Sequence, residues 1–397
     1  MLGLVRSAEE KIGNLRTPTF AIILLMKPKV AIVCDWLVSR GGAERVILAM
    51  SNMFPQAPIY TTVYDGRNLP EFSEREVITS FIQKLPLALK KYPMYLPLMP
   101  YAFEQFDFSE FDIVISSCHS CSKGIITKPR TLHICYCHSP MRYAWDSCHQ
   151  YFEQYGVPAP LQPSAKKMLH ELRLWDRLAA ERVDFYIANS NHVKQRITKY
   201  YRKDSEVIYP PVETEKFLGQ QKNAEGQYYL AVGRLTPYKR FDLLVETFND
   251  LKLPLVIVGT GKEEEKLKKR AGRFITFLGT VSDTQLQEIY SKAIALVFPQ
   301  TEDFGITPLE AMSCGRPVIA FEDGGALETV VPGKTGLFFS EQNLESLKKT
   351  ILEFTGMKWN YAQIRKHAEQ FDRQVFERKL RQFIDEKWEI WQKRMVK

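Results

Sequence analysis

The chain has 397 residues, of which 45% are hydrophobic and 25% charged. This length suits two domains that each bury a core, and the composition excludes a disordered or fibrous protein. The net charge of +8 is spread along the chain and favours anionic ligands or lipid headgroups, but without a zinc-finger spacing, an RNP-like motif or a dense basic arm we expect no nucleic-acid partner.

The N-terminal stretch precedes the first recognisable element. Residues 1–26 are predicted to be an extension or a disordered arm. The reason is that the sequence from Met26, Met-Lys-Pro-Lys-Val, looks like a natural beginning of the protein. The apolar run Phe20–Met26 is shorter than the ~20 residues that a membrane-spanning helix needs. Seven cysteines without a convincing secretory signal predict free thiols and a cytoplasmic location.

Five of the cysteines lie near histidines, so a zinc site has to be considered. Cys118 and Cys121 have a ligand-like spacing, but Cys135 and Cys137 would point to opposite faces of a strand, and no second CxxC follows. We therefore expect no metal. The other members of this cluster are Cys148, His119, His138 and His149.

The first half begins with an apolar run at Val30–Cys34, which predicts a strand, and continues with an amphipathic helix over residues 43–54. Gly41 and Gly42 between them would let the main chain approach a ligand at the helix N-terminus, although a tight turn explains them equally well. Further strands are expected at Ile59–Val63, Val77–Ser80 and Ile113–Ser116.

The segment Lys84–Phe106 is rich in Leu, Met and aromatic residues and contains four prolines and several lysines. The first interpretation is that the apolar side chains of this segment pack in the core. An apolar surface edged by Lys84, Lys90 and Lys91 would also suit peripheral contact with a membrane or a lipid-linked acceptor.

A strand predicted over His133–Ser139 ends in His138, where packing does not require a histidine, although a histidine at a strand end is more often structural. A strand at Asp184–Ser190 and a basic helix follow, and two prolines place a domain boundary near Val212. Candidate acceptor-side residues come directly after the strand with the histidine, namely Arg142, Tyr143, Trp145 and Asp146.

The second half alternates strands at residues 228–233, 255–259 and 274–279 with helices, which predicts a doubly wound parallel sheet. Arg234 and Lys239 follow the strand-end Gly233 and would neutralise a diphosphate, or would form an ordinary solvated basic loop.

The stretch Ile294–Ala320 predicts a strand, a turn, a helix and a second strand. We expect Thr307 to cap the helix, Pro308 to be its first residue and Glu310 to complete a capping box. The turn would present N–H groups to an anion. Glu302 and Glu310 would accept hydrogen bonds from hydroxyl groups on either side of it, a layout that fits a nucleotide sugar.

These residues carry a resemblance. Glu302 and Glu310 resemble the E-x7-E signature of retaining GT-B glycosyltransferases (family 4, group 1), and YCHSPMRYAWD resembles the mannosyltransferase-like branch. The resemblance covers about Lys29–Asp372 and implies an α/β protein with two Rossmann-like, doubly wound parallel-sheet domains across a cleft. It implies an acceptor-binding domain of residues 27–212 plus 373–397, with a returning amphipathic C-terminal helix, and a nucleotide-sugar-binding domain of residues 213–372.

The resemblance also implies roles for the residues. Glu302 would contact the donor sugar, Glu310 the nucleotide ribose, and His138 would line the cleft beside the reacting sugar. Arg234 and Lys239 would clamp the diphosphate. The remaining donor-binding positions would be Gly41, Gly42, Gly233 and the main chain of Phe304, Gly305 and Ile306.

The implied reaction moves a hexose, mannose from GDP-mannose first of all, to a glycan or lipid-linked acceptor in cell-surface polysaccharide synthesis. It proceeds by same-face attack without a protein nucleophile or a cofactor. No convincing D-x-D motif is present, so we expect metal-independent activity. UDP-sugars are an alternative to GDP-mannose as donors. The alternative functions are those of a sugar-phosphate synthase, a nucleotide-sugar epimerase or a non-catalytic nucleotide-sugar-binding protein.

Overall fold

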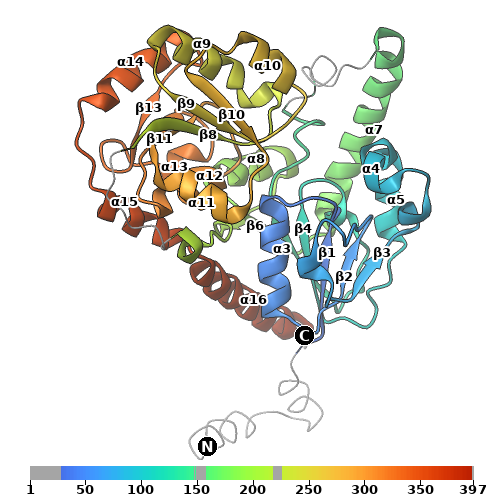
Figure 1. The fold of residues 1–397 in the computed structure, drawn as a ribbon. Coiled ribbons are helices and arrows are strands. Elements are labelled where there is room, and N and C mark those ends of the chain that lie inside the picture. The colour runs from blue at the N-terminus through green and yellow to red at the C-terminus, as the bar shows by residue number, and fades with distance from the viewer. Residues whose placement is uncertain (1–27, 147, 149–157, 218–225, 396–397) are drawn as a thin grey trace, which may run out of the picture.

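The computed structural model describes residues 28–146, 148, 158–217 and 226–395, so the predicted arm of residues 1–26 and His149 lie outside the described part. The protein is an α/β protein with two parallel sheets, each covered by helices on both faces (Figure 1). The predicted fold class is confirmed.

The first sheet has seven parallel strands in the order β3-β2-β1-β4-β5-β6-β7. The strand order reverses between β1 and β4, and ligands of such sheets bind at the carboxyl ends of the strands at this point. The strands are β1 (Val30–Cys34), β2 (Ile59–Thr61), β3 (Val77–Thr79), β4 (Ile113–Cys118), β5 (Leu132–Cys137), β6 (Phe185–Ala188) and β7 (Ser205–Val207).

The second sheet has six parallel strands in the order β10-β9-β8-β11-β12-β13, with the reversal between β8 and β11. It has no antiparallel pair among the described residues, as expected for strands joined by helices. The strands are β8 (Tyr228–Val232), β9 (Leu255–Val258), β10 (Ile275–Gly279), β11 (Ala293–Phe298), β12 (Val318–Phe321) and β13 (Gly336–Phe339).

The helices complete the layers. Those of the first domain are α3 (Gly42–Met53), α4 (Ala88–Lys91), α5 (Met99–Glu104), α7 (Gln162–Ala179) and α8 (Asn191–Tyr201). Those that follow are α9 (Phe241–Leu251), α10 (Glu264–Arg270), α11 (Asp283–Ser291), α12 (Ile306–Ser313), α13 (Ala326–Thr329), α14 (Leu344–Thr355), α15 (Tyr361–Ala368) and α16 (Arg373–Met395). None of the helices in the described ranges is both long and apolar enough to cross a bilayer.

The last helix, α16, starts beside the link between the two sheets, where Val212 and Asp372 form an isolated parallel bridge. It then runs away from the second sheet and packs on α3 and β5 of the first domain (Figure 1). Its apolar stripe is buried in the core of the first domain, which ties the C-terminal end of the chain to that domain. The stripe consists of Phe376, Leu380, Phe383, Ile384 and Trp391.

The segment from Lys84 to Phe106 forms short helical pieces with two different faces. Leu96, Met99 and Phe103 are buried in the core, as the first interpretation of this segment required. Leu87 and Met94, however, are 61% and 70% exposed. The segment therefore contributes both to the core and to an apolar surface.

Candidate active site

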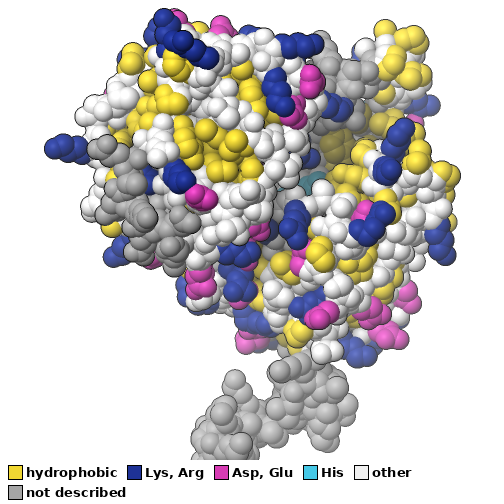
Figure 2. Space-filling model, viewed as in Figure 1, with side chains coloured by type: hydrophobic (Ala, Val, Ile, Leu, Met, Phe, Trp, Pro, Cys, Tyr) yellow, Lys and Arg dark blue, Asp and Glu magenta, His cyan; other side chains and the backbone are white. Residues whose placement is uncertain are grey.

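The carboxyl ends of the strands at the two reversal points lie close together. The side chain of Ile306, at the start of α12, comes within 2.9 Å of the position that a Cβ on Gly42 would occupy, so the two domains are in contact here. The surface is hollowed between the two lobes, and a histidine is visible in the hollow (Figure 2). This position is where α/β sheets of this kind bind ligands.

The loop after β8 brings a cation to a carboxylate. The Lys239 Nζ lies 3.1 Å from the Glu302 Oε1 and close above Gly233, where a Cβ would be only 3.0 Å from the same Nζ. Arg234, in the same loop, is exposed, and burial raises the pKa of Glu44 of the first domain while nearby Arg234 partly offsets that rise. The structure thus brings Lys239 to Glu302, with Arg234 in the same loop as the lysine.

The turn before α12 offers hydrogen-bond donors. The main-chain N–H groups of Phe304 and Gly305 donate to no other described residue. The turn is held from behind, because the Gly325 N–H donates to the Glu302 carbonyl at 2.9 Å and a Cβ on Gly324 would clash with that carbonyl. Such free N–H groups at a helix start form a site for an anion.

The predicted capping box is wrong. The helix begins at Ile306, and Gly305 precedes it with a φ of 86°, which glycine adopts readily. Thr307 and Pro308 therefore lie inside the first turn, and no side chain caps this helix.

The Glu310 side chain does not turn back to the start of its helix, as a capping box would require. Its Oε1 lies 2.6 Å from the Arg45 Nη1 of the first domain, and its Oε2 accepts a 2.8 Å hydrogen bond from the Tyr290 hydroxyl. Burial, and then the Glu310 charge, raise the pKa of Tyr290 well above its usual value, so this hydroxyl stays a donor. The carboxylate predicted to bind a ribose is thus paired with an arginine in this structure.

His138 lies at the end of β5, and its Nε2 is 2.7 Å from the Ser117 Oγ. Burial, with a contribution from nearby His119, lowers the pKa of His138 to about 3. The ring is therefore neutral at physiological pH, which suits a hydrogen-bonding role and not that of a cation.

Two neutral histidines, the buried His133 and the partly buried His138, should make the protein sensitive to acid. Burial lowers the pKa of His133 to about 4, and His138 behaves similarly. As the pH falls below 6.5 the unfolded chain binds protons that the folded chain does not, so stability present above pH 6.5 is lost toward pH 4. Between pH 6.5 and 5 we expect the free energy of unfolding to fall by about 1.5 kcal/mol per histidine.

Urea unfolding at the two pH values measures this loss. The variant His133→Gln should remove one histidine's share of the loss, whereas the same change at the exposed His170 should not. A free energy of unfolding that is independent of pH over this interval would contradict the prediction.

Of the candidate acceptor-side residues, Arg142 alone lies beside the donor-side loop. Its guanidinium is 3.9 Å from Glu302 and 3.7 Å from Asp303. Tyr143 instead bonds Ser120, Trp145 donates to the buried Asp176, and Asp146 pairs with Arg196. These three residues join the segment after β5 to the loop after β4, to α7 and to α8.

Contacts that no local pattern indicated also join the domains. Arg196 of α8 pairs with Asp303 at 2.6 Å, and Glu328 of α13 accepts hydrogen bonds from the N–H groups of Asn191 and His192 at the start of α8. Sequence reasoning missed Arg45, Arg196 and Asp303 because their partners lie more than 100 residues away in the chain.

The thiol of Cys135 lies close to those of Cys118 and Cys137. Cys118, Cys121, Cys135 and Cys137 are buried free thiols. Over the described ranges, no three His, Cys, Asp or Glu side chains are arranged so that they could hold a metal ion.

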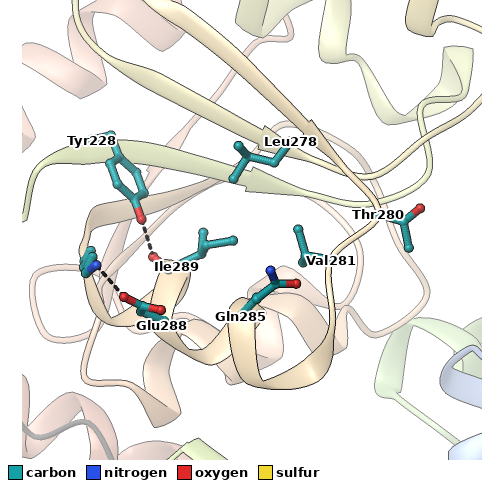
Figure 3. A pocket seen from close by; sticks show the side chains of 8 residues that line it. Tyr228, Leu278, Thr280, Val281, Gln285, Glu288 and Ile289 are labelled. Carbon is teal, nitrogen blue, oxygen red and sulfur yellow. Dashed lines mark hydrogen bonds and ion pairs between the residues drawn. The ribbon is translucent and has the colours of Figure 1, made fainter.

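A separate cavity of about 420 Å³ lies between β10 and α11 (Figure 3). The Tyr228 hydroxyl donates to the Ile289 carbonyl there, and Glu288 pairs with Lys292. Its lining residues are Tyr228, Leu278, Thr280, Val281, Gln285, Glu288, Ile289 and Lys292, none of which was predicted as a site residue. Its single lysine is already paired, so the cavity is poorly suited to a diphosphate.

Two family models match the chain. The model for "Glycosyl transferases group 1" matches residues 212–371, and that for "Glycosyltransferase Family 4" matches residues 40–216. The chain belongs to the family 4, group 1 glycosyltransferases. The family predicted by resemblance is confirmed.

Curated glycosyltransferases match parts of the chain. It is 31% identical to the uncharacterized glycosyltransferase MJ1178 of Methanocaldococcus jannaschii over 188 residues, which is 46% of this chain and 52% of that protein. It is 29% identical to the O-antigen chain mannosyltransferase RfbU of Salmonella typhimurium over 205 residues, 47% of this chain and 58% of that protein. The chain thus spans about half the length of these relatives.

The fold has solved counterparts among the GT-B glycosyltransferases. One is the crystal structure of Anabaena Alr3699/HepE in complex with UDP and glucose, with a TM-score of 0.64 and 17% identity. The likeness covers 90% of this chain and all of that one, and at this identity it shows the fold alone.

Proposed function

We propose that the protein is a retaining glycosyltransferase that moves a hexose from a nucleotide diphosphate sugar to a glycan or lipid-linked acceptor. The observation that carries the proposal is the Lys239–Glu302 pair, 3.1 Å apart, beside the free N–H groups that precede α12. A diphosphate would bind to these N–H groups and to Lys239. Glu302 would accept hydrogen bonds from the donor sugar.

In the proposed reaction the bond between the sugar C1 and the diphosphate oxygen breaks, and a bond from C1 to the acceptor oxygen forms on the same face. The acceptor proton goes to the leaving phosphate, so no protein nucleophile is required. Arg234, Lys239 and the start of α12 stabilise the charge that develops on the diphosphate. For this reason we propose that the activity needs no divalent cation and survives EDTA.

The donor is proposed to be GDP-mannose. Support comes from RfbU, which is named as a mannosyltransferase, and the setting proposed for the reaction is cell-surface polysaccharide synthesis in the cytoplasm. Glu310 would bind the ribose after Arg45 leaves it, because the two carboxylate oxygens are occupied in this structure.

A thermal-shift screen with GDP-, UDP- and ADP-sugars tests the proposal, since a ligand that binds only the folded state raises the melting temperature. We expect GDP-mannose to give the largest shift. Release of GDP should then require an acceptor and persist in EDTA. A screen in which no nucleotide sugar shifts the melting temperature would contradict the proposed function.

The apolar surface of the first domain supports a peripheral contact with membrane lipids. Its residues lie in the helical segment from Phe81 to Glu104 and along α7, and a hydrogen bond from Trp175 of α7 to Glu104 of α5 joins these two parts. Exposed lysines border the apolar side chains, a pattern that favours an anionic lipid surface. The exposed apolar residues are Phe81, Leu87, Met94, Leu98, Tyr101, Leu161, Leu174 and Leu178, and the lysines include Lys84, Lys90 and Lys91.

Sedimentation with lipid vesicles tests this contact. We expect the protein to sediment with vesicles of phosphatidylglycerol and phosphatidylcholine, and the variant L87E/M94E to bind about tenfold more weakly because it places charges against the lipid. A matched double change at exposed Leu327 and Leu352, in the second domain, should have no effect. Equal sedimentation of all three proteins would exclude this surface.

A further inference from the structure

An aromatic and histidine cluster lies at the carboxyl edge of the first sheet, beside His138. Trp36 follows β1 and His119 follows β4, and these strands are neighbours in the sheet. The ring centroids of Trp36 and His119 are 4.5 Å apart, those of Trp36 and Tyr92 are 4.9 Å apart, and His138 lies 6.2 Å from His119. Trp36 and Tyr92 are both partly exposed.

The buried carboxylate of Asp35 holds His119 in place. Asp35 is buried and accepts hydrogen bonds of 2.7 to 2.9 Å from four successive N–H groups, those of residues 119–122. The same carboxylate lies 3.1 Å from the His119 Nδ1. The Asp35 carboxylate favours the tautomer of His119 with its proton on Nδ1, which leaves Nε2 as an acceptor to which no other described residue bonds.

Glu44, in the first turn of α3, is a buried carboxylate without an ion-pair partner within 4 Å among the described residues. Burial raises the pKa of the Glu44 carboxyl, and Arg234 lies near enough to act in the opposite direction. A Cβ on Gly41 would lie 2.8 Å from the Glu44 Oε2, so the glycine makes room for this carboxylate. A buried carboxylate of this kind is favourable when hydroxyl groups donate to it.

We propose that Trp36, Glu44 and His119 form the acceptor subsite, and that its occupant is an uncharged sugar ring. The apolar C–H face of a pyranose ring would pack on Trp36 and Tyr92, and two of its hydroxyl groups would donate to the Glu44 carboxylate and the His119 Nε2. Glu44 disfavours a phosphorylated group at this position through like-charge repulsion. Nearby Arg234 places the subsite next to the proposed diphosphate site, so the inference rests on the proposed function.

Three variants and two independent readouts test the subsite. The variants are Glu44→Gln, His119→Asn, which keeps an N–H group for Asp35, and Trp36→Phe. The first readout is the shift in melting temperature with GDP-mannose or UDP-glucose. The second is the binding of n-octyl glycosides of mannose, glucose and galactose. Saturation-transfer NMR gives their dissociation constants, and steady-state kinetics give the KM of the same glycosides as acceptors in the transfer reaction.

We expect each variant to weaken glycoside binding and raise its KM by about tenfold or more, with the donor-induced shift unchanged. The matched controls Glu264→Gln, in the first turn of α10, and His170→Asn, on α7, should behave as wild type. Unchanged glycoside affinity in all three variants overturns the inference. A wild-type protein that binds a donor but none of the glycosides also overturns it, whereas a protein that binds no donor contradicts the proposed function instead.

Discussion

Replacing Lys239 by alanine should lower kcat by about 100- to 1,000-fold, the usual cost of removing one group that stabilises developing charge. The Lys239 Nζ lies 3.1 Å from Glu302 and above the strand-end Gly233. In the proposed reaction it meets the departing diphosphate, whose charge grows as the sugar bond breaks. The effect should therefore fall more on kcat than on the KM for the donor.

Steady-state kinetics with the best donor from the thermal-shift screen measure this loss. Lys334→Ala, which removes an exposed lysine from a turn of the same domain, is the matched control and should keep wild-type rates. A Lys239→Ala enzyme with kcat within about threefold of wild type would rule out a role for this cation in leaving-group stabilisation.

Breaking the buried ion pair between Lys123 and Asp176 should cost the first domain about 3–5 kcal/mol of stability. Both side chains are at most 1% exposed, and Asp176 also accepts hydrogen bonds from Trp145 at 2.8 Å and Tyr201 at 2.9 Å. Burial alone would lower the pKa of Lys123, but the Asp176 charge raises it well above its usual value, so the lysine stays charged. Asp176→Asn would leave this cation buried without a counter-ion.

Chemical denaturation of Asp176→Asn measures the cost. The double variant K123M/D176L should recover most of the lost stability, because it removes both charges and not one. Asp250→Asn, which breaks the surface pair with Lys348, is the control and should leave the denaturation midpoint unchanged. A single variant at Asp176 as stable as wild type would show that the pair is not needed for folding.

The strands could be predicted because the sheets are buried. Val30–Cys34 is apolar along its whole length, and the structure has a strand with the same bounds. Two strands were not predicted. Ser205–Val207 is a short, partly polar edge strand, and Gly336–Phe339 begins with a glycine that a pattern of β-branched residues does not include.

The site could be predicted only in part. Local patterns placed Lys239 and Glu302 at strand ends, and the parallel sheet brings these ends together. No local pattern could show that Glu310 pairs with Arg45, because 265 residues separate them and only the packing of the two domains joins them. The capping-box prediction failed because Gly305 adopts a positive φ directly before the helix. The helix therefore begins at Ile306, one residue before the predicted cap, Thr307.

The roles of Tyr143, Trp145 and Asp146 show the same limit. They follow the strand that ends in His138, and their order in the sequence suggested a common surface. In the structure their polar atoms bond to the loop after β4, to α7 and to α8. Neighbouring residues in a turn point in different directions, and only the tertiary structure decides which of them reaches the ligand.

A crystal structure of the protein with GDP-mannose would show directly where the donor binds. We expect the diphosphate to lie against the N–H groups of residues 304–306, Lys239 to contact it, and Arg45 to have moved away from Glu310 to admit the ribose. A nucleotide bound in the cavity between β10 and α11, with the Lys239 and Glu302 side chains not in contact with it, would rule out the proposed donor site.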